Sequence, residues 1–140
     1  MQHPSTKRYV AIVDKAQPRH RIANAVAHLA LGIGHCGLDE GSTYTSFKDK
    51  AGNTVAVLTD YPFIILGAKN AGQLRQIHQN AAKLAVPCMA YLANMFVGTP
   101  EEQRAQIEAS TPEEHEYIGL VLFGDAEVLR QLTKRASLLD

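Results

Sequence analysis

Three polar residues of one predicted helix, Arg21, Asn24 and His28, have side-chain types that suit a small ligand-binding site. On a helical wheel of about 100° per residue, with Ile22 at 0°, these three side chains lie at about 200–260°. They therefore share a face that points away from the apolar side of the helix, which contains Ile22. A guanidinium, an amide and a titratable imidazole together can hold an anion or an acyl carbonyl. We therefore predict that these three residues border a shallow pocket for a small-molecule ligand. An ordinary solvated helix face is the alternative.

Other candidate chemistry lies at the end of the same helix. The pair His35-Cys36, set among glycines, offers a thiol beside a base, or an inert loop cysteine, because no Asn or Asp that would orient the base is identifiable. Residues 32–37 match G-x-G-x-x-G, but they follow a helix and not a strand, which favours helix termination over nucleotide binding. The six histidines lack the spacing of metal ligands. We expect no metal and no cofactor, and the catalytic residues stay unassigned.

Composition narrows the class of protein. A chain of 140 residues and 15.3 kDa has the length of a single domain, which we place at residues 1–140. Its 14 Lys and Arg balance its 14 Asp and Glu, so the basic excess typical of nucleic-acid binding is absent. Charge is nevertheless segregated, because residues 99–127 carry eight acids against Arg104 alone. No apolar run approaches the ~18 residues of a membrane span, and two cysteines without an apolar leader favour a cytoplasmic protein.

Strands and helices alternate along the chain. Apolar, β-branched runs predict strands at residues 9–13, 63–67, 88–92 and 117–123, and a polar turn at 49–53 predicts a β-hairpin between residues 44 and 60. Helical spacing predicts one long helix with Ile22, Val26, Leu29 and Ile33 on its buried stripe. It predicts a second helix over residues 74–84, preceded by a sequence at residues 70–73 that resembles a capping box.

Two Thr-Pro-Glu-Glu sequences, at residues 99–102 and 111–114, are typical of helix starts. The first predicts a short helix to about Ala109, whereas the second has room for one turn. Asp125 caps a last amphipathic helix that is expected to end near Leu139. The order of strands and helices along the chain predicts an α/β fold. We expect a three-layer α/β/α sandwich with a mixed, mainly four-stranded sheet plus a β-hairpin insertion.

The sequence resembles a known family. From about Lys7 to Ser137, the element order and the phrases at residues 20–28 (HRIANAVAH) and 70–74 (NAGQL) are similar to the family labelled domain of unknown function 2000. The fold of that family resembles type 2 peptidyl-tRNA hydrolase. The resemblance implies a peptidyl-tRNA hydrolase type 2-like sandwich and a homodimer.

Those hydrolases carry the motif K-x-x-x-Q-x-x-H in the first helix, an aspartate after the third strand and a Thr-Gln segment. Here Arg21 and His28 match the lysine and the histidine, whereas Ala25 stands in place of the glutamine. Asn94 falls near the aspartate, and an acidic stretch from Thr99 to Glu116 replaces the Thr-Gln segment. Three hypotheses follow: a small-ligand binding protein or undetected enzyme at the first helix, a peptidyl-tRNA hydrolase, and a non-catalytic dimeric regulatory module.

Overall fold

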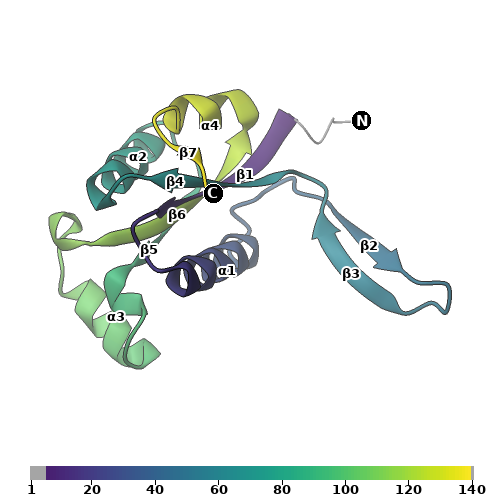
Figure 1. Ribbon diagram of the computed structural model, residues 1–140, viewed down its shortest axis with the longest axis horizontal. Coiled ribbons are helices and arrows are strands. Elements are labelled where there is room, and N and C mark those ends of the chain that lie inside the picture. The colour runs from purple at the N-terminus through teal and green to yellow at the C-terminus, as the bar shows by residue number, and fades with distance from the viewer. Residues whose placement is uncertain (1–5, 140) are drawn as a thin grey trace.

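A five-stranded mixed sheet forms the centre of the computed structural model, which describes residues 6–139 (Figure 1). In spatial order its strands are β5 (Cys88–Leu92), β6 (Tyr117–Asp125), β1 (Lys7–Asp14), β4 (Phe63–Ala68) and β7 (Ser137–Leu138). β1 pairs in parallel with β4, and the other neighbouring strands are antiparallel. All four predicted sheet strands therefore belong to one sheet, as expected from their apolar runs.

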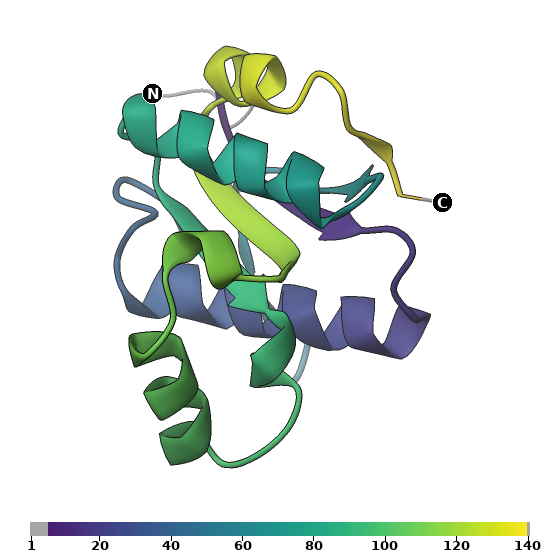
Figure 2. The same ribbon diagram turned by 90° about the vertical axis from the view of Figure 1, so that its left-hand side faces the viewer.

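Helices cover both faces of this sheet (Figure 2). On one face α1 (Arg19–His35) buries Leu29 and Ile33 with Tyr9, Val121, Phe123 and other apolar residues of the sheet. On the opposite face α2 (Ala71–Lys83) and α4 (Ala126–Leu132) enclose a second core. The short helix α3 (Pro100–Glu108) follows a single turn at Ala93–Met95. Residues 6–139 thus form a mixed α/β structure with four α-helices.

Caps set several of the helix ends where the sequence predicts them. Asn70 Oδ1 accepts a hydrogen bond from the Gln73 amide at 2.9 Å and starts α2. Thr99 and Glu102 form a capping box at α3. The repeated sequence at residues 111–114 starts only the single turn Pro112–Glu114. Gly37 ends α1 with a φ of 68°, the left-handed conformation that favours glycine.

Two details differ from the sequence-based expectations. The buried stripe of α1 contains Ala25, fully buried, whereas the expected Val26 is only partly buried. The small Ala25 side chain lets the helix turn slightly and approach the sheet closely. The last helix ends at Leu132, and Ser137–Leu138 instead pairs with β4. The free edge of β4 offers unpaired backbone groups, and this pairing outweighs the helical spacing of Ala136.

The predicted hairpin forms a separate two-stranded sheet that projects from the body, and we call it the arm (residues 44–59; Figure 1). Its strands are β2 (Tyr44–Lys48) and β3 (Thr54–Thr59), joined by a turn in which Gly52 has a φ of 88°. Every residue of β2 is exposed, and so are four of the six in β3. The arm therefore has almost no packing partner in the body beyond its base.

A buried polar network fixes the base of the arm. The Tyr9 hydroxyl donates to the buried Asp39 carboxylate at 2.5 Å and lies 2.6 Å from Ser42 Oγ. Tyr44, the first residue of the arm, donates to the same Asp39 oxygen at 3.0 Å. The Thr43 hydroxyl donates to Asp60 at 2.7 Å across the two chain segments that enter and leave the arm. β1 thereby holds both ends of the arm in place.

The network makes stability fall at alkaline pH. Burial, and next the hydrogen bond to Asp39, raise the pKa of Tyr9 far above its ordinary value. The stabilisation is complete below the unfolded pKa of about 10 and is lost as pH rises above it, because only the unfolded chain then releases this proton. We expect Tyr9 to lower the free energy of unfolding by up to about 1.4 kcal/mol per pH unit in that range.

Urea unfolding between pH 8 and pH 11.5 measures this slope. In Tyr9→Phe the free energy of unfolding should fall less steeply with pH, by nearly the contribution of one proton. The part of the slope that remains should come from Tyr91 and Tyr117, because burial also raises their pKa values. Tyr61→Phe, which removes a hydroxyl bonded to the Gly41 carbonyl at 3.4 Å, serves as the matched control. Equal slopes in Tyr9→Phe and the wild type would contradict this account.

Candidate functional site

The polar face of α1 lies against β5 and the turn that follows it. The Asn24 Oδ1 atom is 3.2 Å from the Tyr91 hydroxyl, which is also 3.1 Å from the Met95 carbonyl oxygen and donates to either. The Arg21 guanidinium lies 4.7 Å from the centre of the Phe96 ring, a cation–π contact. The His28 ring is 6.0 Å from that of Tyr91. Aromatic side chains therefore gather all three predicted site residues on one side of α1.

A cleft of ≈ 750 Å³ opens beside His28, between α1, β5 and α3. Most of its lining is apolar, and the polar groups belong to His28, Tyr91, Gln103, Arg104 and Glu108. The full lining comprises His28, Leu29, Gly32, Met89, Ala90, Tyr91, Met95, Gly98, Pro100, Gln103, Arg104, Ile107 and Glu108. An apolar hollow of this size with a few polar groups is typical of small-molecule sites.

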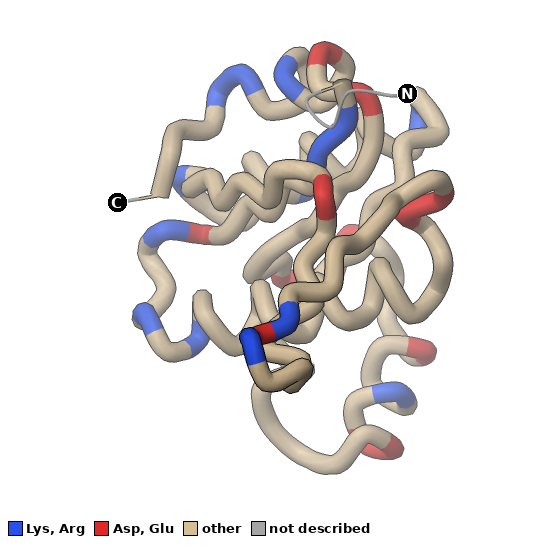
Figure 3. Tube along the Cα trace, turned by 90° about the vertical axis from the view of Figure 1, so that its right-hand side faces the viewer, with Lys and Arg blue, Asp and Glu red and all other residues tan. Residues whose placement is uncertain are grey.

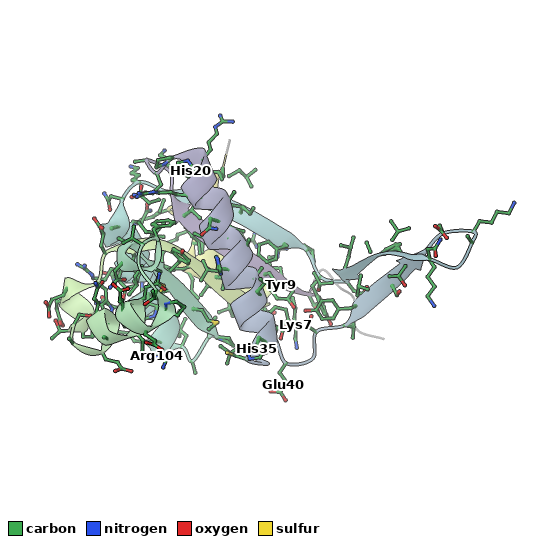
Figure 4. The ribbon with its side chains drawn as sticks, turned by 90° about the horizontal axis from the view of Figure 1, so that it is seen from below. Lys7, Tyr9, His20, His35, Glu40 and Arg104 are labelled. Carbon is green, nitrogen blue, oxygen red and sulfur yellow. The ribbon has the colours of Figure 1, made fainter. Side chains whose placement is uncertain are left out.

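The α3 side of the cleft is built by two neighbouring polar residues. Gln103 Nε2 donates to the carbonyls of Met95 at 3.1 Å and Val97 at 3.0 Å, so it fixes the loop that precedes α3. Arg104, the next residue, projects from α3 on the side of α1 away from the arm (Figure 4). Within residues 6–139 no carboxylate lies within ion-pair distance of its guanidinium. A ligand anion in the cleft would therefore meet an unpaired positive charge.

The three residues predicted from the sequence lie differently with respect to the cleft. Of the three predicted residues, only His28 lines the cleft, because Asn24 is bonded to Tyr91 and Arg21 lies on Phe96. Ligand binding by all three stays a prediction. Sequence reasoning missed Arg104, and its position as the lone cation among eight acids was the available signal.

The positions matched to the hydrolase motif do not meet at this cleft. Ala25 is fully buried against the sheet and offers no polar group. Asn94 lines a different recess of ≈ 220 Å³ together with Glu114 and His115. Its buried Oδ1 atom has no hydrogen-bond partner within the described chain. Asn94 is therefore not placed to assist His28.

Two further large hollows lie elsewhere on the described surface. One, of ≈ 750 Å³ between α2 and α4, is lined by Lys69, Lys134 and Arg135 among amide side chains. The other, of ≈ 800 Å³, lies along α1 and is lined in part by Val26, Ile65 and Leu139. Neither contains His28. Residues 6–139 include no cluster of three metal-ligating side chains, and none of their helices has the length and apolar character needed to cross a membrane.

The two cysteines differ in accessibility. Cys36 is exposed at the end of α1, and its sulfur makes no disulfide. Cys88 is partly buried in β5, and burial raises the pKa of its thiol to about 12. Because the thiolate is the reactive form, only Cys36 should react with alkylating reagents at neutral pH.

This difference in accessibility predicts that one of the two thiols is alkylated much faster than the other. Treatment of the folded protein with iodoacetamide at pH 8 should modify Cys36 at least about tenfold faster than Cys88, as measured by peptide mass spectrometry. In urea the two rates should converge, since unfolding exposes Cys88. Equal rates in the folded protein would show that β5 does not shield Cys88, and Cys36→Ser provides the control for assignment.

The comparisons with known proteins identify relatives of uncharacterised function. A family model described as "Protein of unknown function (DUF2000)" matches residues 7–140. A solved structure of a protein of unknown function from Agrobacterium tumefaciens strain C58 is 22% identical, with a TM-score of 0.81 over 95% of this chain and 97% of that chain. At this identity the likeness shows the fold alone. A search of the curated proteins gives no match.

Proposed function

This chain belongs to the DUF2000 family of proteins of unknown function, and from the cleft beside His28 we propose that it binds a small ligand with an apolar body and a carboxylate or carbonyl head group. The observation that carries this proposal is the combination of a largely apolar ≈ 750 Å³ hollow with an imidazole and an unpaired guanidinium at its edge. Met89, Met95 and Ile107 would cover the apolar part of the ligand. Arg104 and His28 would hydrogen-bond to its head group.

Binding is favoured over catalysis by the surroundings of His28. A histidine that acts as a general base is usually oriented by a carboxylate or another hydrogen-bond acceptor on its second nitrogen. Within residues 6–139, His28 makes only a ring contact with Tyr91 and no such hydrogen bond. In this proposal Arg21 and Asn24 are positioning residues, because they hold Phe96 and Tyr91 beside the cleft.

N-octanoylglycine is a suitable probe, because it joins an eight-carbon chain to an amide carbonyl and a carboxylate. Isothermal titration should show saturable binding to the wild type. Hydrogen bonds to a charged partner contribute about 1.5–3 kcal/mol, so Arg104→Ala and His28→Ala should each weaken binding at least about tenfold. His20→Ala, a histidine at the other end of α1 (Figure 4), should change affinity less than about twofold.

Two results would reject the proposal: no saturable binding by the wild type at low millimolar probe, or unchanged affinity in both cleft variants. Circular dichroism of each variant separates lost binding from lost folding. Octan-1-amine, with the same chain and a positive head group, tests the head-group assignment and should bind at least about tenfold more weakly than the acid.

We further propose that the fold is of the type 2 peptidyl-tRNA hydrolase kind while the hydrolase reaction is absent. The four main strands with helices on both faces support the first part. The buried Ala25 and the separately placed Asn94 support the second, since each stands where that family has a polar catalytic side chain. The acids of α3, Glu101, Glu102 and Glu108, would also repel a tRNA that approached the cleft.

A deacylation assay with N-acetyl-aminoacyl-tRNA at low salt tests this statement, with an authentic type 2 peptidyl-tRNA hydrolase as positive control. We expect no release above the uncatalysed rate. Turnover near ~1–10³ s⁻¹, the range of ordinary enzymes, would make the protein a hydrolase instead.

A further inference from the structure

The outer face of α1 is apolar although it faces away from the sheet. Residues 22–34 include no charged side chain. The helix buries only the stripe Ile22, Ala25, Leu29 and Ile33, while Ala23, Ala27 and Gly34 on its outer side are exposed and Leu31 is 72% exposed. An apolar stripe on a helix is usually buried against another element. Within residues 6–139 nothing covers this outer face.

The arm is a second uncovered apolar surface. Tyr44, Phe47, Val55, Val57 and Leu58 are all about half exposed or more, up to 70% for Val55. An isolated two-stranded hairpin is marginally stable in water, and exposed apolar patches mark interaction sites. Because the network around Asp39 fixes its base, the arm is held outward as a formed surface.

One face of the arm continues the outer face of α1. In the register of the arm Tyr44 pairs with Thr59 and Ser46 with Val57, so Tyr44, Ser46 and Val57 share a face by alternation, whereas Phe47 and Leu58 point to the other side. A methyl group placed on Gly34 would lie 3.9 Å from the Tyr44 hydroxyl oxygen. The Tyr44 face therefore begins where the outer face of α1 ends.

We propose that a second copy of this chain covers both surfaces, with the Tyr44–Val57 face of each arm lying on the outer face of the partner's α1. A two-fold contact is self-complementary, so one arrangement covers both arms and both helices. The lengths also agree. The five residues of β2 extend about 17 Å, and the outer stripe from Ala23 to Gly34 rises about 17 Å along the helix.

Charge favours the same partner. The turn of the arm carries Lys48 and Lys50 on either side of Asp49, visible in Figure 3 as two blue segments around a red one. The helix α3 carries Glu101, Glu102 and Glu108 against the single Arg104. Within one chain the arm and α3 lie on opposite sides of α1, so the turn of the arm is on the side away from α3 (Figure 4). An arm that crosses the partner's α1 would bring its lysines to the partner's α3.

Two neighbouring residues of the arm give a matched test of the covered face. Val57 and Leu58 are each 57% exposed but lie on opposite faces. By sedimentation velocity, the wild type should be a dimer at micromolar concentration. The dimer dissociation constant should rise at least about tenfold more in Val57→Arg than in Leu58→Arg. Leu31→Arg should also dissociate the dimer, whereas Leu84→Arg, at the exposed end of α2, should not.

A charge exchange tests where the arm ends. Lys48→Glu combined with Lys50→Glu should weaken the dimer, and adding Glu101→Lys with Glu108→Lys should restore it. A monomeric wild type throughout this range, a Leu58→Arg effect as large as that of Val57→Arg, or a charge exchange without recovery would each overturn the proposal. All the substituted side chains are exposed in the single chain, so each variant is expected to fold. Circular dichroism of every variant checks this. The proposal does not depend on the ligand cleft, and it is measured without ligand.

Discussion

The burial of β1 and β6 on both faces is the constraint on which the rest of the structure depends. β1 lies between β6 and β4, and its residues from Tyr9 to Val13 are buried. Residues Tyr117 to Phe123 of β6 run antiparallel to it and are equally shielded. A sheet whose central strands are apolar on both sides needs helices on both sides. The parallel pairing of β1 with β4 also requires a long crossover, and α1 and the arm lie within it.

The candidate cleft is a consequence of how closely α1 approaches this sheet. Ala25 is fully buried, and at Gly32 a methyl group would lie 3.4 Å from the Met89 sulfur, so small residues set the distance between α1 and β5. The polar face of the helix is thereby brought to Tyr91 and Phe96. Since α3 is held by Gln103 to the loop before it and not packed into the sheet, a hollow remains between α1 and α3. The cleft therefore has α1 and β5 on one side and the shorter, more polar helix α3 on the other.

Surface chemistry is distributed unevenly over a chain of zero net charge. Acidic residues gather on α3 and on the segment that leads to β6. Residues 22–34 of α1, in contrast, include no Lys, Arg, Asp or Glu. The arm carries charge only in its turn, at residues 48–50, and at its base, where Asp60 accepts from Thr43 and Thr45. The Tyr9–Asp39 hydrogen bond connects these features, because it joins the first strand of the core to the end of α1 and to the start of the arm. A substitution at Tyr9 in β1 would therefore also alter the base of the arm.

The sequence by itself determined the elements. Continuous β-branched runs predicted strands buried on two faces, and the residues Asn70 and Thr99 fixed where α2 and α3 begin, because these signals act within a few positions of the chain. Only the tertiary structure decided that Ser137–Leu138 adds to the edge of β4, that Ala25 and not Val26 faces the sheet, and that Asp39 bonds to Tyr9, 30 positions away. It also decided that Arg104 comes to the cleft of His28 whereas Asn94 does not. Local spacing sets which face of a helix is polar, but the partners of that face depend on packing between segments far apart in the chain.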